Sequence, residues 1–126
     1  MNDLEELLDR LTAAVGDRDG AVALELFADD ADTSLVTSEE FVARGREWVV
    51  RLFELYAEGD TTFSWQWDRR EVAESGDVGW ILATGVETMV GADHGHELPY
   101  RLTLVCERRD GRWLIRHFHG SSPVEE

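Results

Sequence analysis

The hydrophobic period of this chain changes at Asp60, and that change limits the folds it can adopt. Before Asp60 the apolar residues recur three or four positions apart, which is the spacing of one face of an α-helix. After it, Phe63, Trp65 and Trp67 alternate with polar residues, which is the spacing of a β-strand. Helices followed by strands predict an α+β fold in which the helices pack on one sheet.

Three helices are expected before the change of period. The first ends at Gly16, the second begins at Asp19, and the third covers residues 44–57 and stops before Gly59. A short extended segment, residues 33–36, lies between the second and the third. The helices are therefore separated by short connections, which suits a small layer packed on a sheet.

Four long strands are expected after the change of period, joined as an antiparallel meander. The turns are Ser75-Gly76-Asp77, the polar segment 91–97, and Arg109-Asp110-Gly111, which fits a three-residue hairpin loop. Strands of this length span about 35 to 40 Å, so the sheet must twist and curl, with an irregularity near Arg69-Arg70. The predicted shape is a half-open cone with helices on its concave side and a cavity between.

Both faces of these strands are partly apolar, so the inner face depends on the register. Pairing Arg108 with Arg112 places Trp113, Ile115 and His117 on the outer face. The expected inner residues of the closing hairpin are Tyr100, Leu102, Leu104, Cys106, Leu114, Arg116, Phe118 and Gly120. In the preceding strand the inner residues are expected to be the even-numbered ones, Trp80, Leu82, Thr84, Val86 and Thr88.

The composition favours one acidic domain covering residues 1–126. The formal charge is −15, with 27 acidic residues against 12 basic ones that are all arginine, so nucleic acid is an unsuitable partner. The missing lysine indicates adaptation to high salt or a genome that favours arginine codons. Cys106, the single cysteine, is expected in the core. No signal peptide or membrane span is evident, so a soluble cytoplasmic protein is expected.

The closing run R-R-D-G-R-W-x-I-x-H-F-H-G-S, residues 108–121, resembles the nuclear-transport-factor-2-like superfamily. Within it the chain is most similar to SnoaL-like domains of the group that includes the association domain of calcium/calmodulin-dependent protein kinase. The resemblance implies a cone-shaped α+β roll with an internal pocket and assembly into dimers or larger rings. It also implies that the pocket arginines of the kinase domain are replaced here by Val86, Leu104 and Gly120, which leaves Arg116 as a single positive charge.

Ligand binding would use the residues expected to face the cavity. These are Trp48, Leu52, Trp67, Trp80, Tyr100, Leu104, Arg116 and Phe118. Core packing is the alternative role for the tryptophans, because aromatic side chains dominate small cores. Arg116 is expected to have a partner, which is a protein acid such as Asp68 or Glu54, a structural water, or the anionic end of a ligand.

Catalysis would need a carboxylate or histidine inside the pocket, and the expected inner strand face offers none. An acid would have to come from Asp32 near the mouth, from Asp68 or from Glu54 on the third helix, and Asp32 and Asp68 are the candidate bases. The alternative role of all three is that of surface carboxylates. His117 and His119 lie two apart on a strand, yet no third ligand is evident. We therefore expect neither metal nor cofactor.

Two functions remain open for this sequence. The first is a small-molecule-binding or association domain with an apolar pocket, assembled as a homodimer or larger homo-oligomer. The second is a SnoaL-like isomerase, cyclase or dehydratase acting on a small hydrophobic substrate. A carboxylate within hydrogen-bond reach of the pocket centre would favour the second.

Overall fold

The computed structural model describes residues 3–37, 42–92 and 95–123, and these residues form three helices and six strands. The helices are α1 (Asp3–Gly16), α2 (Gly20–Glu25) and α3 (Arg46–Glu58). The strands are β1 (Ser34–Val36), β2 (Val42–Arg44), β3 (Thr62–Ser75), β4 (Val78–Val90), β5 (Gly95–Arg109) and β6 (Arg112–Ser121). The predicted order of elements is confirmed. β2 is absent from the predicted elements, because the sequence pattern places its last residue, Arg44, in the third helix.

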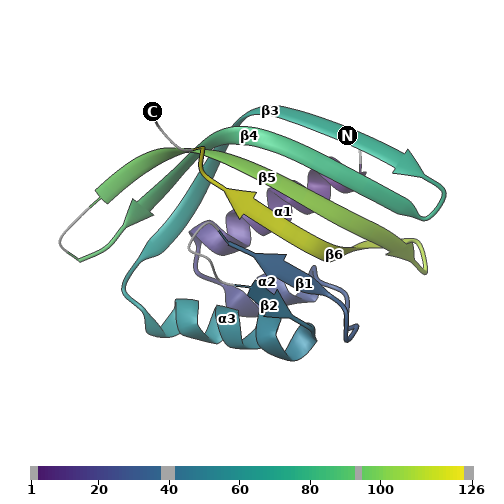
Figure 1. The fold of residues 1–126 in the computed structure, drawn as a ribbon, viewed down its shortest axis with the longest axis horizontal. Coiled ribbons are helices and arrows are strands. Elements are labelled where there is room, and N and C mark those ends of the chain that lie inside the picture. Colours follow the sequence, from purple (N-terminus) through teal and green to yellow (C-terminus); the bar gives the residue numbers. More distant parts are fainter. Residues whose placement is uncertain (1–2, 38–41, 93–94, 124–126) are drawn as a thin grey trace.

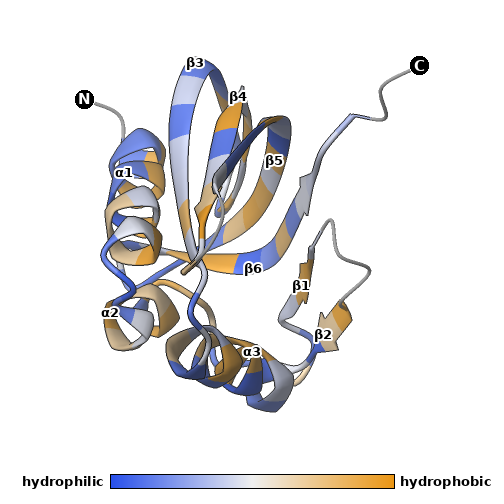
Figure 2. Ribbon diagram, turned by 90° about the vertical axis from the view of Figure 1, so that its left-hand side faces the viewer, coloured by the Kyte–Doolittle hydropathy of each residue, from blue (hydrophilic) through white to orange (hydrophobic). Residues whose placement is uncertain are grey.

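The six strands form one curled sheet that does not close, in the order β2-β1-β6-β5-β4-β3. β1 runs parallel to β6, and the other neighbours are antiparallel. All three helices lie on the concave side, α1 along β3 and α3 beside β1 and β2 (Figures 1 and 2). Among the described residues no helix is long and apolar enough to cross a membrane.

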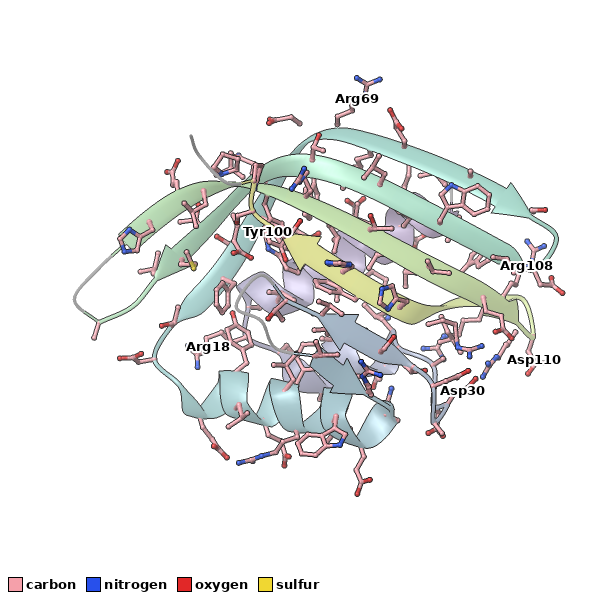
Figure 3. All side chains as sticks on the ribbon, viewed as in Figure 1. Arg18, Asp30, Arg69, Tyr100, Arg108 and Asp110 are labelled. Atoms are coloured by element: carbon pink, nitrogen blue, oxygen red, sulfur yellow. The ribbon has the colours of Figure 1, made fainter. Side chains whose placement is uncertain are left out.

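The helices are held to the sheet by apolar stripes and by one arginine. α1 buries the stripe Leu4, Leu7, Leu8, Leu11, Ala14 and Val15. Arg18, which follows α1 and is labelled in Figure 3, donates hydrogen bonds to the carbonyl oxygens of Tyr56 at 2.7 Å and Gly59 at 2.6 Å. Its guanidinium therefore satisfies acceptors that the end of α3 leaves open.

The first long hairpin contains the irregularity that the sequence predicts. Trp67 pairs with Gly85 and Arg69 pairs with Thr84, so Asp68 is an extra residue on β3. A bulge of this kind lets a long strand bend. It also reverses the alternation along β3, which explains why the apolar residues change parity between Trp67 and Val72.

The closing hairpin differs from the prediction in two ways. Arg109 pairs with Arg112, so the loop holds only Asp110 and Gly111, with φ angles of 52° and 77°. Two positive φ angles fit the two-residue turn that matches strand twist. Further along, Cys106 pairs with Ile115 and Val105 with His117, which leaves Arg116 as an extra residue.

These shifts change which side chains face the helices. The inward placement of Tyr100, Leu102, Leu104, Cys106, Phe118 and Gly120 is confirmed. Trp113 and Ile115, predicted on the outer face, are 6% and 0% exposed and belong to the core. Arg116 and Leu114, predicted on the inner face, lie on the outer one.

The predicted inner face of β4 is also wrong. Ile81 lies opposite Leu104, so the odd-numbered residues of β4 share the concave face with the even-numbered residues of β5. Ile81 and Ala83 are fully buried, whereas Trp80 is 44% and Leu82 is 41% exposed. Apolar content could not separate the two faces, because each carries large hydrophobic side chains.

Candidate functional site

A cavity lies on the concave side of the sheet, between the helices and the long strands. Its empty volume is about 580 Å³ when the open mouth and the adjoining solvent are counted, so the space enclosed by protein is smaller. Six aromatic side chains line it: Phe53, Tyr56, Phe63, Trp65, Tyr100 and Phe118. Aliphatic lining comes from Leu11, Val15, Leu35 and Leu52, and the polar lining residues are Thr37 and Glu87.

Glu87 is the acidic group of this cavity among the described lining residues. It comes from β4, is only 4% exposed, and lies opposite Trp65 of β3. The Trp65 indole Nε1–H donates a hydrogen bond of 2.7 Å to Oε2 of Glu87. Because a buried carboxylate needs such donors, this bond holds its head group at the cavity wall.

Trp65 is also the centre of an aromatic cluster that shapes the cavity. Its ring stacks on Tyr100 with centroids 5.8 Å apart and an interplanar angle of 12°. Phe118 lies 5.9 Å away on β6, and Trp67 lies 5.6 Å away on β3. Tyr100, labelled in Figure 3, comes from β5, so three strands bring their rings together around the indole that binds Glu87.

The hydroxyl of Tyr56 joins the walls of the cavity. It donates a hydrogen bond of 2.8 Å to the carbonyl oxygen of Val15 and accepts one of 2.9 Å from the backbone N–H of Phe63. Burial raises the pKa of Tyr56 above its ordinary value. Its proton is thus committed to α1, which makes Glu87 the better proton acceptor or donor for a bound molecule.

Arg116 lies on the opposite face of the sheet from this cavity. It forms ion pairs with Glu107, with Asp32 at 2.5 Å and with Asp30 at 3.3 Å. The partner is therefore a set of protein carboxylates, as one branch of the prediction had it, but Asp68 and Glu54 are not among them. Arg116 is not placed to bind the carboxylate of a ligand in the cavity.

The other sequence-predicted site residues divide into three groups. Leu52, Tyr100 and Phe118 line the cavity, and Trp67 packs directly behind it on Trp65. Leu104 is buried in the core, outside the lining. The remaining candidates, all exposed at the surface, are Trp48, Trp80, Asp32, Asp68 and Glu54.

The outer face carries a charged cluster, defined by Asp30, Asp32, Glu107, Arg109 and Arg116. Arg109 donates hydrogen bonds to Asp30, which is labelled in Figure 3, at 2.8 and 2.5 Å and to Glu107 at 2.9 Å. The hydrogen bonds from Arg109 are the largest cause that lowers the pKa of both carboxyl groups. These acids are consequently held ionised by neighbouring guanidinium groups.

Two histidines lie beside this cluster on β6. The Ser34 hydroxyl and Nδ1 of His117 are 2.7 Å apart, and the rings of His117 and His119 are 6.1 Å apart. Burial and the charge of His119 lower the pKa of His117. In the part of the chain that the structure describes, no group of three or more His, Cys, Asp or Glu side chains could hold a metal ion.

Cys106 lies in the core, as predicted. Its side chain is buried, and that burial raises the pKa of the Cys106 thiol to about 12. A thiol in this state is almost entirely protonated at neutral pH and is a poor nucleophile. It fills space under the sheet.

Glu87 is the functional candidate that the sequence analysis missed. It was assigned to the outer face of β4 together with Ile81, Ala83 and Met89, which are apolar residues at the same parity. A single acid among apolar residues of one strand face was the available signal. That signal is weak because both faces of β4 carry large apolar residues, and the sequence pattern favours the even-numbered face as the inner one.

The fold is similar to three solved structures that cover nearly the whole chain. A proposed dehydratase of the NTF2-like family from Streptomyces avermitilis has a TM-score of 0.87 and 18% identity, covering 98% of this chain and 95% of that one. A proposed scytalone dehydratase from Novosphingobium aromaticivorans has a TM-score of 0.84 and 12% identity, covering 97% and 83%. A proposed calcium/calmodulin-dependent protein kinase II association domain from Xanthomonas campestris has a TM-score of 0.73 and 26% identity, covering 98% and 87%.

The sequence itself also matches a known domain family. No curated protein matches this chain. The family model of the SnoaL-like domain matches residues 4–125, which is almost the full length, and the predicted resemblance is confirmed. Together with the curled sheet and its three helices, this match shows that the chain belongs to the SnoaL-like domain family and has the NTF2-like α+β fold.

Proposed function

We propose that this protein is an enzyme that moves a proton on a small, largely apolar substrate, with Glu87 as the acid–base group. The observation that carries the proposal is a carboxylate that is 4% exposed and lines an aromatic cavity. Carboxylates in such surroundings lose hydration that would stabilise their charge, and this is the setting in which they act as general bases. Two of the similar structures are proposed dehydratases, which fits this class of chemistry.

The proton movement needs one group that can both accept and return a proton. Glu87 would take a proton from a substrate carbon next to a carbonyl group, while the electron pair of that C–H bond moves toward the carbonyl oxygen. Where that carbon also neighbours a C=C bond, returning the proton to the far carbon of that bond moves the double bond next to the carbonyl group. This completes an isomerisation without any other reactant. The hydrogen bond from Trp65 would keep the carboxylate oriented through both steps.

A simple carbon acid tests this proposal without knowledge of the natural substrate. The probe is 5-nitrobenzisoxazole, from which a base removes one ring proton as the N–O bond breaks to give a coloured cyanophenolate. We expect the wild-type protein to accelerate this elimination and Glu87→Gln to reduce the rate by about 100-fold or more. Glutamine keeps the shape and can still accept the Trp65 hydrogen bond, so folding should be preserved.

The matched control is Glu74→Gln, which removes one negative charge at an exposed position of β3. Its elimination rate should equal that of the wild type. An unchanged rate in Glu87→Gln, in a protein shown to be folded by circular dichroism, would contradict the proposal. The second candidate function, a non-catalytic binding or association domain, would then be the better account of the cavity.

Assembly into a homodimer is also proposed, with a corrected contact surface. The predicted surface included Trp113 and Ile115, which are buried within the subunit. The exposed apolar residues of the outer face include Val78, Trp80 and Leu82 on β4, and a patch of this kind commonly marks a protein contact. Sedimentation of Trp80→Asp against the wild type at micromolar concentration tests it, and two identical profiles would count against this surface.

A further inference from the structure

We infer that the cavity selects small organic cations, namely protonated amines on an apolar or ring-bearing body, and rejects carboxylates. The inference rests on the proposed ligand site and names the class of molecule it takes. It does not depend on catalysis by Glu87, because charge selection can operate in a site that only binds. It also differs from one alternative that the sequence left open, in which a ligand carboxylate faces Arg116.

The charged residue of the described cavity wall is an acid. Glu87 contributes a carboxylate to the wall, and the described lining residues include no Arg, Lys or His. The basic group expected there, Arg116, is held on the outer face by Asp30, Asp32 and Glu107. An anionic ligand would therefore meet a like charge in apolar surroundings, where repulsion is weakly screened.

The wall of the cavity is largely aromatic. Tyr56, Phe63, Trp65, Tyr100 and Phe118 all line the cavity with Glu87. Aromatic rings carry a negative potential over their faces, and sites built from several rings are suited to ammonium groups. The same rings provide apolar area for the rest of the ligand, so one wall serves both ends of an amine with a hydrophobic body.

The hydrogen-bond donors of Tyr56 and Trp65 at the cavity are already used within the protein. The Tyr56 hydroxyl donates to Val15, and the Trp65 indole donates to Glu87. These donors are used inside the protein, and an ionised carboxylate offers acceptors only. A ligand that supplies donors, as an ammonium group does with each of its N–H bonds, matches this wall better than one that supplies acceptors.

The charge of the whole molecule acts in the same direction. A formal charge of −15 lowers the local concentration of anions and raises that of cations near the surface. Salt at physiological concentration screens this field within about 8 Å, so it assists encounter more than it decides affinity. Selectivity must therefore come from the cavity itself, and a variant of Glu87 can test it.

The experiment compares four probes that share one ring and differ at one substituent: benzylamine, benzyl alcohol, toluene and benzoate. Binding to the full chain is measured by calorimetry near pH 7, where the amine is protonated and benzoate is ionised. We expect benzylamine to bind about tenfold tighter than benzyl alcohol. We expect toluene to bind more weakly than the alcohol and benzoate to give no detectable heat.

Variants assign this preference to the cavity. In Glu87→Gln the ratio of amine to alcohol affinity should fall to about threefold or less, while Glu74→Gln should keep the wild-type ratio. Equal binding of amine and alcohol by the wild type, or measurable binding of benzoate, would overturn the inference. An unchanged ratio in folded Glu87→Gln would overturn it as well.

The two proposals fail separately in these assays. Amine selection without any elimination of 5-nitrobenzisoxazole would leave the cation site standing and remove the enzymatic proposal. Elimination that depends on Glu87, together with binding of benzoate, would support the enzymatic proposal and remove the cation site. Where both hold, benzylamine should inhibit the elimination competitively and benzoate should not, because only the amine occupies the carboxylate.

Discussion

The two faces of strands β4 to β6 carry similar kinds of side chain and yet differ in what they can do. Each face has large apolar residues, and each has a glutamate, Glu87 on the concave face and Glu107 on the convex face. Glu107 is hydrogen-bonded by Arg109 and Arg116, and those bonds lower its pKa. Glu87 instead accepts from the neutral indole of Trp65 in an aromatic cavity.

The comparison teaches that the surroundings of a carboxylate, more than its presence, decide its role. The convex acids are neutralised by arginines and connect the end of β5 to the segment before β1, which is a structural task. On the concave side Glu87 lies among aromatic rings at the wall of a cavity, where a bound molecule can contact it.

The assignment of the two faces can be broken by placing one polar residue on each. Ile115→Asn puts an amide into the core, where Ile115 is fully buried, and should lower the free energy of unfolding by about 4 kcal/mol or prevent folding. Leu114→Asn, one position earlier on the convex face, should cost less than about 1 kcal/mol. Urea unfolding followed by circular dichroism measures both, and equal losses would show that the faces are misassigned.

The shape of the cavity can be tested at Gly120, which lies beneath its aromatic rings. A Cβ atom at this position would lie 1.7 Å from the Tyr100 hydroxyl and 3.2 Å from Phe118. Gly120→Ala should therefore push these rings into the cavity, lower the free energy of unfolding by about 1 to 3 kcal/mol, and weaken binding of benzylamine. In Gly95→Ala the nearest atom is 3.9 Å away, so both quantities should stay at their wild-type values.

Most of the fold could be predicted because the sequence pattern and the turn residues act locally. The helices, the long strands and the bulge near Arg69 follow from spacing and from residues such as Gly76. The site could not be predicted in the same way, because it depends on strand register. Asp110 with Gly111 fits a two-residue or a three-residue loop, and the extra residue at Arg116 leaves no mark in the sequence.

The orientation of β4 shows most clearly why the site could not be predicted from the sequence. Trp80 and Leu82 are as hydrophobic as Ile81 and Ala83, so burial energy does not distinguish the two parities. Only the pairing of β4 with β5 decides which parity faces the core. That pairing is set by contacts between residues that are far apart in the sequence. Once the parity is known, Glu87 is found on the buried face without further information.

The charged cluster of the convex face should make a smaller and pH-dependent contribution. Arg109 hydrogen bonds and the nearby Arg116 lower the pKa of Asp30 and Glu107 in the folded state. A lowered carboxyl pKa stabilises the fold at pH values above the unfolded value, and this stabilisation disappears as pH falls through the folded value. Arg116→Leu should therefore lower the melting temperature by a few degrees at neutral pH.

The difference from the wild type should shrink as the pH falls below about 4, where these carboxyl groups take up protons. Arg69→Leu is the control, because Arg69 is exposed and its pair with Glu71 at 3.1 Å lies in solvent (Figure 3). This control should differ little from the wild type at any pH. A pH-independent loss in Arg116→Leu would show that its packing, and not its charge, stabilises the fold.

The smallest effect concerns the molecule as a whole. Self-repulsion of −15 charges should be relieved by salt, so the melting temperature should rise gradually between low and molar KCl. Sucrose at matched osmolality separates charge screening from general exclusion effects. A melting temperature that is unchanged in KCl, or that rises equally in sucrose, would remove the interpretation of the acidic composition as an adaptation to high salt.

The central claim is that ligands enter the concave cavity and meet Glu87, and the indole N–H groups test it most directly. Trp65 donates to Glu87 inside the cavity, whereas Trp48 and Trp80 are exposed elsewhere. In nitrogen–proton correlation spectra, titration with benzylamine should shift the Trp65 indole signal, assigned by Trp65→Phe, and leave those of Trp48 and Trp80 in place. A shift confined to Trp48 or Trp80, with Trp65 unmoved at saturation, would contradict the account.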